Sequence, residues 1–224
     1  MANNFWIELT ESNQQFEAII LEVISKKLDK AFGKAYKIIL QKLRNLVHQA
    51  ISESDVITEL RDGEQLRGEL GLTSGLARSA ATSITEEVAN SVELEYKSIS
   101  FLPTGDAKGG LSLWIQKSDL SNVLKIAQAQ VSYYSKRYKK AVKLDWLDWL
   151  LTEGDRIIVA KFHFEPKRGR GRSGIGDMKK QGVFRMDSQY AGTEDDNFIT
   201  RTLQDKKFTD KLTILIEKEI GKQL

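Results

Sequence analysis

The N-terminal part of the chain carries apolar residues at the three-and-four spacing of one helix face. This spacing runs from Ser12 to Ser52 and predicts one helix of about forty residues, capped at its start by Thr10 or Ser12. Gly33 is its weak point, and a break there into a hairpin packed on itself is the alternative. The apolar positions are Phe16, Ile19, Ile20, Val23, Ile24, Leu28, Phe32, Ile38, Ile39, Leu43, Leu46, Val47 and Ile51.

A helix of this length would extend ~60 Å, about twice the diameter of a small domain. Its own chain is therefore expected to leave part of the apolar stripe uncovered, and another copy of the chain would cover it. We treat residues 1–54 as a long N-terminal helix and residues 55–224 as a single α+β domain. The candidate subunit-interface residues on the helix are Ile20, Ile24, Leu28, Phe32, Ile39 and Leu43.

The segment after the long helix is acidic and is divided into short pieces by glycines at positions 63, 68, 71 and 75. A second clear helical pattern follows and predicts a helix over 74–90. Its expected buried stripe is Leu76, Ala80, Ile84 and Val88.

The period then changes from helical to two, which predicts strands. Val92, Leu94 and Tyr96 alternate with charged residues, and a similar alternation over 111–116 follows the glycine-containing turn PTGDAKGG. We expect an antiparallel pair here. A helix is predicted to follow from Ser118 or Asp119, and its apolar positions are Leu120, Val123, Leu124, Ala127 and Val131.

The C-terminal third mixes short strands and helices. Strands are predicted over 156–164 and 183–186, with a tryptophan-rich turn LDWLDWLL before them. The chain closes with two helices, near 198–203 and 207–220. The sum is an α+β fold: a small, mostly antiparallel sheet flanked by helices, with a long N-terminal helix.

The composition limits the classes of protein to which this chain can belong. The 224 residues are 41% hydrophobic and 29% charged, as in a folded globular protein, and include no cysteine. The missing thiols exclude disulfides and fit a reducing compartment or a particle assembled inside a cell. The N-terminus lacks the pattern of a signal peptide and no long apolar run occurs, so we expect no membrane association.

The most unusual stretch is FHFEPKRGRGRSGIGDMKKQGVFR, residues 162–185, which we interpret as an extended Arg/Gly hairpin at about 165–185. It contains Gly169, Gly171 and Gly174 in the spacing GxGxxG. In a dinucleotide site that loop runs into a helix whose N-terminal amides hold the pyrophosphate, whereas here a strand is predicted to follow. The spacing therefore does not indicate a nucleotide cofactor, and none is expected.

Three interpretations of the basic residues remain open. The tracts 133–143 and 167–180 could bind nucleic acid through phosphates and stacked tyrosines, or they could be ordinary solvated surface. In the third, Arg168, Arg170 and Arg172 form an assembly arm that pairs with acidic residues of an adjacent copy, such as those over 59–69. The candidate nucleic-acid contacts are Lys136, Arg137, Lys139, Lys140, Lys179 and Lys180.

Catalytic patterns are scarce. His48 and His163 have no motif relation to a serine or a carboxylate. Asp145 and Asp148 fit helix-end carboxylates beside packed tryptophans, and residues 194–197 fit a helix start, with Thr193 or Asp195 as the cap, better than a calcium loop. We expect no enzyme activity and no metal site.

The order of elements, together with several motifs of the C-terminal third, resembles virion proteins of tailed bacteriophages. The motif residues are the Trp-Leu-Leu segment with Gly154, then Arg172-Ser173-Gly174, Met178, Arg185, Ala191-Gly192-Thr193, Asp196-Asn197-Phe198 and Thr200-Arg201.

The nearest group is the neck and tail-completion family, whose members are small α+β proteins that form rings between head portal and tail. The resemblance implies a ring-forming homo-oligomer, six-fold or twelve-fold, in the virion neck or tail after assembly in the host cytoplasm. Its implied partners are portal or connector and tail proteins, with non-specific contact to passing DNA. A tail terminator or another tail structural protein is the alternative within this class, and a nucleic-acid-binding module is the alternative outside it.

Overall fold

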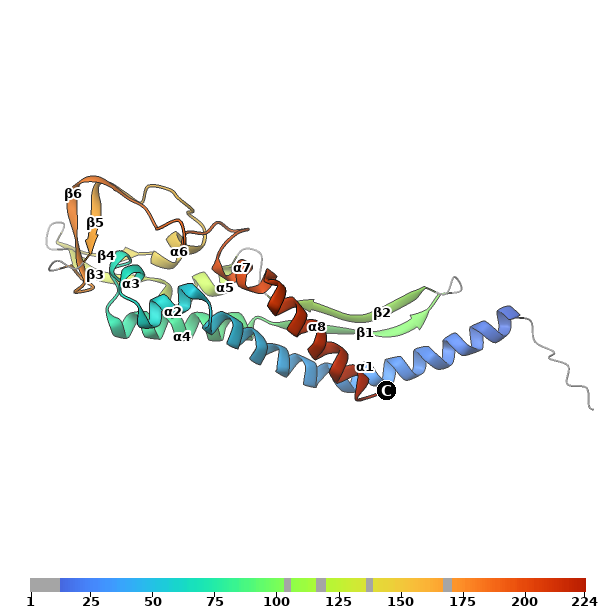
Figure 1. Cartoon of the computed structure of the whole chain (residues 1–224). Coiled ribbons are helices and arrows are strands. Elements are labelled where there is room, and N and C mark those ends of the chain that lie inside the picture. The colour runs from blue at the N-terminus through green and yellow to red at the C-terminus, as the bar shows by residue number, and fades with distance from the viewer. Residues whose placement is uncertain (1–12, 103–105, 116–119, 136–138, 167–170) are drawn as a thin grey trace, which may run out of the picture. The chain divides into compact units, whose positions relative to one another are not determined.

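The computed structural model describes residues 13–102, 106–115, 120–135, 139–166 and 171–224. The elements are α1 (Asn13–Ser52), α2 (Asp55–Asp62), α3 (Gln65–Glu69), α4 (Ser74–Asn90), β1 (Glu93–Phe101), β2 (Ala107–Trp114), α5 (Ser121–Leu124), η1 (Ala127–Ala129), β3 (Val131–Ser135), β4 (Lys140–Leu144), α6 (Trp146–Leu151), β5 (Val159–Pro166), β6 (Gly176–Phe184), α7 (Phe198–Gln204) and α8 (Lys206–Gly221) (Figure 1). The predicted α+β class and the long N-terminal helix are confirmed.

The strands form three separate two-stranded sheets within the described residues, β1 with β2, β3 with β4 and β5 with β6. The chain divides into two compact units. The first consists of Met1–Gln41, Leu94–Leu113 and Leu215–Leu224, and the second of Lys42–Glu93 and Trp114–Ile214. These boundaries differ from the predicted division at residue 54, because the first part of α1 groups with the β1–β2 hairpin.

In the first unit, strand β1 is tied to helix α1 around Gly33. The ring of Tyr96 lies 3.7 Å from the position that a Cβ on Gly33 would take, and it stacks on Tyr36 with ring centroids 6.3 Å apart. The Tyr96 hydroxyl donates to the carbonyl and carboxylate oxygens of Asp29, and the Ile99 amide donates to the same carboxylate at 2.8 Å. These hydrogen bonds lower the pKa of Asp29. Gly33 therefore marks close packing inside a continuous helix, and the alternative of a break there is wrong.

In the second unit, the core is built around α2, α4 and the C-terminal part of α1. Helix α4 spans the predicted residues and starts at the cap Thr73, whose side chain accepts from the Leu76 amide. Its buried face is shifted from the predicted stripe: Leu76 is exposed, whereas Ala80, Ile84 and Val88 are buried as expected. The further buried residues of α4 are Ala77, Ala81, Thr85 and Ala89.

The predicted helix that reaches Val131 is wrong. The structure has the short α5 and η1 instead, and Val131 begins strand β3, where it pairs with Leu144. The predicted start at Ser118 or Asp119 lies outside the described residues, as do Thr10 and Ser12, the predicted caps of α1. A β-branched residue followed by tyrosines has strand propensity, and pairing with β4 favours the strand.

The β5–β6 hairpin packs on α3 through two glycines. A Cβ on Gly68 would lie 2.8 Å from Cζ of Phe164, and one on Gly176 would lie 2.5 Å from the same atom. Both distances are too short for any side chain, so the Phe164 ring fills the space beside α3. The hairpin register shifts between Ala160 and Phe162, where Lys161 has a φ of 67°.

Candidate assembly surfaces

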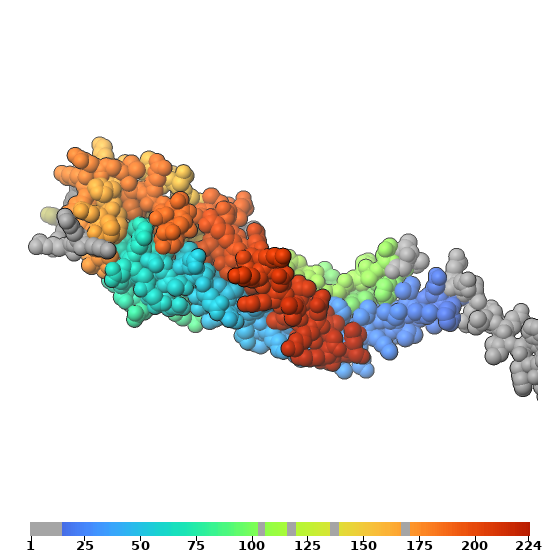
Figure 2. Space-filling model, in the orientation of Figure 1, coloured from blue at the N-terminus to red at the C-terminus, as the bar shows by residue number. Residues whose placement is uncertain are grey.

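An apolar patch lies exposed on the first part of α1 in the first unit. It consists of Phe16, Ile19, Ile20, Val23 and Ile24, whose exposed fractions are 41–53%. The spacing i, i+3, i+4, i+7, i+8 places all five on one face of the helix. Figure 2 shows this part of α1 in blue. We call these five residues the α1 patch. Clustered exposed apolar residues of this kind usually mark an interface.

The six interface candidates on α1 divide into three classes. Ile20 and Ile24 belong to the α1 patch and are exposed. Leu28 and Phe32 are partly buried. Ile39 and Leu43 are fully buried within the chain itself and are therefore wrong as interface residues, since no surface remains for a partner to contact.

The residues around the α1 patch are charged. Glu17 and Glu22 flank it, and Lys27, Lys30 and Lys34 continue the same helix face toward the C-terminus. All five are exposed. Glu22 is ion-paired with Lys26 of the same helix, with 2.6 Å between Oε1 and Nζ, so Glu17 is the carboxylate beside the patch that faces the lysines of a neighbouring copy in a staggered contact.

Arg172, one of the three predicted assembly arginines, is bound inside its own chain. Its Nε donates to the carbonyl oxygen of Gly71 at 2.8 Å and its Nη2 to that of Leu70 at 3.3 Å. The guanidinium also lies 4.8 Å from the ring centroid of Tyr133. Gly71 has a φ of +65°, and a Cβ there would lie 2.4 Å from Nη2 of Arg172. Arg172 therefore links the segment before β6 to the α3–α4 loop and to β3, and the prediction that it reaches another copy is corrected. Arg168 and Arg170 lie outside the described residues.

Replacing Arg172 with lysine is expected to lower the free energy of unfolding by about 1–2 kcal/mol. A lysine keeps the charge but loses the planar fork that serves two carbonyls and a ring at once. Urea unfolding measures the difference. The matched control is Arg156→Lys, because Arg156 is exposed and its guanidinium pairs with Glu153 at the surface, so that change should stay within about 0.5 kcal/mol. Equal losses of unfolding free energy in the two variants would contradict the role of Arg172 as a link between these segments.

The candidate nucleic-acid contacts are spread over two hairpins of the second unit. Lys139 precedes β4 and Lys140 begins it, while Lys179 and Lys180 lie on β6, opposite His163 and Phe162 respectively. All four lysines are exposed, which is the ordinary state of lysine and does not by itself indicate a nucleic acid. Lys136 and Arg137 lie outside the described residues.

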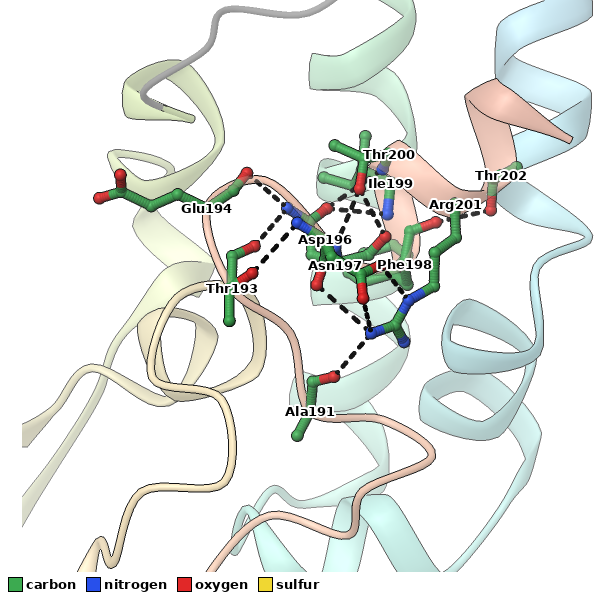
Figure 3. Close-up of polar contacts among 10 residues, drawn as sticks. All are labelled: Ala191, Thr193, Glu194, Asp196, Asn197, Phe198, Ile199, Thr200, Arg201 and Thr202. Carbon is green, nitrogen blue, oxygen red and sulfur yellow. Dashed lines mark hydrogen bonds and ion pairs between the residues drawn. The ribbon is translucent and has the colours of Figure 1, made fainter.

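The loop over 191–197 is held together by polar contacts with the start of α7 (Figure 3). Asn197 is fully buried, and its side-chain oxygen accepts from the amides of Ile199 and Thr200 at 3.0 and 3.2 Å. Its side-chain nitrogen donates to the carbonyls of Thr193 and Glu194 at 2.9 and 3.2 Å. The predicted helix start is confirmed, but the cap is Asn197, not Thr193 or Asp195.

Arg201 of α7 also binds the loop over 191–197. Its Nε donates to Oδ1 of Asp196 at 2.6 Å, and its Nη2 donates to the Ala191 carbonyl at 3.2 Å. The hydrogen bond from Arg201 lowers the pKa of Asp196. Only a glycine fits at position 192, because Asn197 and the Leu150 carbonyl occupy the space that the Cβ of any other residue would need. The residues of this loop that carry the phage resemblance therefore have structural roles, and they join the loop to the end of α6.

The residues considered for catalysis are not brought together. His163 Nδ1 contacts the Gln181 carbonyl at 2.5 Å on the β5–β6 hairpin, and His48 is exposed on α1. Asp148 accepts from the Thr152 hydroxyl at 2.7 Å near the end of α6. In the part of the chain that the structure describes, no group of three or more histidine, cysteine, aspartate or glutamate side chains is arranged to hold a metal ion. Over the same residues, none of the helices combines the length and apolar character needed to span a bilayer.

Comparison of the chain with protein-family models, with curated proteins and with solved structures gave no match. The resemblance to phage neck and tail-completion proteins therefore rests on the motif residues and on the order of elements.

Proposed function

We propose that this protein is a structural virion protein of a tailed bacteriophage, which forms a ring in the neck or tail-completion region and joins the head portal to the tail. The observation that carries the assembly role is the α1 patch, where five large apolar side chains are exposed on one helix face. Such a surface gains free energy when a neighbour covers it, about 1 kcal/mol for each half-exposed side chain. A protein whose function is its interfaces needs no catalytic group.

The charges around the α1 patch favour another copy as that neighbour. In two staggered copies, Glu17 of one helix comes beside Lys27, Lys30 and Lys34 of the next, so a carboxylate faces ammonium groups. A staggered contact uses different surfaces on the two subunits. Repeated around an axis, such a heterologous contact forms a ring when the rotation from copy to copy closes on itself.

The position in the particle follows from the resemblance rather than from the patch. The motif residues of the C-terminal third belong to the second unit, where Arg172, Asn197 and Arg201 hold loops in place. These are among the residues on which the resemblance to neck and tail-completion proteins rests. A tail terminator or another tail structural protein is the alternative position, and it would use the same α1 patch.

The double change Ile20→Glu with Ile24→Glu tests the proposal. It places two carboxylates in the α1 patch, so we expect the ring to dissociate completely to a 25.4 kDa monomer. Native mass spectrometry of the full chain, alone and with purified portal and tail-tube proteins, measures the assembly. The melting temperature should change by only a few degrees, because both side chains are already exposed.

The matched control is Ile214→Glu on α8, which is 62% exposed and lies outside the α1 patch. This variant should assemble as the unchanged chain does. Rings that persist in the double variant, or an unchanged chain that stays monomeric with both neighbours present, would contradict the proposal.

A further inference from the structure

The β1–β2 hairpin of the first unit buries little of its own surface. Among the described residues the two strands form a sheet by themselves, and every residue of β1 and β2 is either half-buried or exposed. A two-stranded hairpin is marginally stable in water, whereas a third strand or a packed helix stabilises it. The hairpin would therefore gain stability from a further strand.

The outer edge of β1 is already occupied by helix α1. Backbone N–H groups of a strand point along the plane of the sheet. The Ile99 amide donates to the carboxylate of Asp29 at 2.8 Å, so it points away from β2 and toward α1. The Tyr96 hydroxyl donates to the same carboxylate. Figure 1 shows β2 on the side of the hairpin that faces away from α1. Within the described residues, the open edge of this hairpin is therefore that of β2.

The edge of β2 lacks the features that usually protect an edge strand from pairing. Lysines and prolines serve this purpose, and β4, β5 and β6 each carry lysine. Strand β2 has no charged residue and no proline from Gly110 to Trp114. A Cβ at Gly110 would also meet no atom within 4 Å. The edge can therefore accept another strand, and a large side chain of that strand can cover the open space at Gly110.

The N-terminal segment has the sequence pattern of such a strand. Residues 1–12 lie outside the described part of the chain, and their sequence places Phe5, Ile7 and Leu9 in alternation with Trp6 and Glu8. Alternation of this kind, with aromatic and β-branched residues, is typical of strands.

The position of this segment in the chain points to the copy it would contact. Residues 5–9 come shortly before Phe16, the first residue of the α1 patch. From Asn13, where α1 begins, the six residues back to Ile7 span at most ~20 Å when extended. A neighbouring copy that covers the α1 patch would therefore lie within reach of residues 5–9.

We propose that residues 5–9 of one copy add a third strand to the β2 edge of the next copy in the ring. The inference rests on the proposed ring, and it names the second surface that each subunit contributes. Because the N-terminal segment of one subunit meets β2 of another, the contact is heterologous, as a ring requires. One short strand adds to the contact at the α1 patch and does not replace it.

Charge and shape together select an antiparallel register. Glu8 is the one charged residue of the segment 5–9, and Lys108 is the one charged residue of β2. The register that places Glu8 opposite Lys108 also places Trp6 opposite Gly110, where the indole covers the open space. Asn4 then lies opposite Ser112.

The absence of cysteine from the chain allows a direct test of this register. The full chain carrying both Asn4→Cys and Ser112→Cys is assembled with purified portal and tail-tube proteins and then oxidised. Opposed residues of an antiparallel pair lie at about 4.5–5.5 Å between Cα atoms, which suits a disulfide. We expect a ladder of covalent oligomers at multiples of 25.4 kDa on a denaturing gel without reductant. Either single-cysteine chain should give no ladder.

The other outcomes separate the competing arrangements. A disulfide within one chain would mean that the segment folds onto its own β2, and dimers from Ser112→Cys alone would mean that two β2 edges pair. Either result would overturn the proposal. Rings that form without a disulfide would overturn this inference and leave the ring intact, whereas a chain that stays monomeric with both neighbours present would overturn the ring as well.

A proline at position 7 tests the contribution of the added strand to assembly. Ile7→Pro removes a backbone donor and interrupts the pairing. The chain concentration for half-maximal assembly should rise at least about tenfold, a change worth about 1.4 kcal/mol. The matched control Ala2→Pro lies before the alternating residues and should assemble as the unchanged chain does. Circular dichroism checks that both variants are folded. Assembly of Ile7→Pro at the same concentration as the control would also overturn the proposal.

Discussion

Replacing Trp146 with alanine is expected to lower the free energy of unfolding by about 3–5 kcal/mol. Trp146 has an exposed fraction of 0% and is the largest fully buried side chain among the described residues. Its indole Nε1 donates to the Gln128 carbonyl at 2.7 Å, so the change leaves both a cavity and an unpaired carbonyl. Thermal unfolding followed by circular dichroism should show a melting temperature ~6–20 °C lower.

Two further variants separate the causes of this loss. Trp114→Ala removes an equally large side chain that is 51% exposed, and should cost no more than about 1 kcal/mol. Trp146→Phe fills most of the cavity but removes the donor to Gln128, and should fall between the other two. If Trp146→Ala and Trp114→Ala were equally stable, the core role of Trp146 would be refuted.

The long elements of this fold could be predicted from the sequence because each carries its own period. Helix α1 keeps an apolar spacing over 40 residues, and α4 and the two closing helices follow the same rule. The spacing of large side chains does not fix which face of a helix is buried. In α4 the second unit buries small alanines and leaves Leu76 exposed, so the pattern of large side chains alone indicates the wrong edge of the stripe.

The short elements depend on partners that are distant in the sequence. Val131 continues a helical spacing, yet it lies in β3 because β4 supplies the pairing, thirteen residues further on at Leu144. Strand β6 begins at Gly176, well before the predicted residues 183–186, because its polar half pairs with β5. Local periodicity contains no information about such pairing.

The candidate surfaces also combine features that local spacing predicts with features that depend on contacts distant in the sequence. Exposure of Ile20 and Ile24 agrees with the expectation that the chain leaves part of the α1 stripe uncovered, whereas Leu43 continues the same spacing and is buried. The charge of Arg172 is visible in the sequence, but its contact with Leu70 and Gly71, about a hundred residues away, is not. The sequence predicts the acidic segment with Glu69 as a surface for another copy, whereas the structure places Glu69 in the wall of a pocket formed with the chain's own β5–β6 hairpin.

Replacing Asn197 with alanine is expected to lower the free energy of unfolding by about 2–4 kcal/mol, the second-largest effect that we predict. The side chain is fully buried and makes four hydrogen bonds, two as the cap of α7 and two to the loop before it. Alanine leaves two amides and two carbonyls without these partners. Urea unfolding of the full chain measures the loss.

A serine at position 197 separates the two contributions of Asn197, as acceptor for the α7 amides and as donor to the loop carbonyls. Asn197→Ser keeps an oxygen that can accept from the α7 amides but loses the donor to Thr193 and Glu194, so it should recover about half of the loss. The control Asn90→Ala changes an exposed asparagine at the end of α4 and should stay within about 0.5 kcal/mol. If Asn197→Ala were as mild as this control, the loop would not depend on its polar contacts. The expected large loss would instead mean that these motif residues stabilise the second unit, and that binding surfaces have to be sought elsewhere, at the α1 patch.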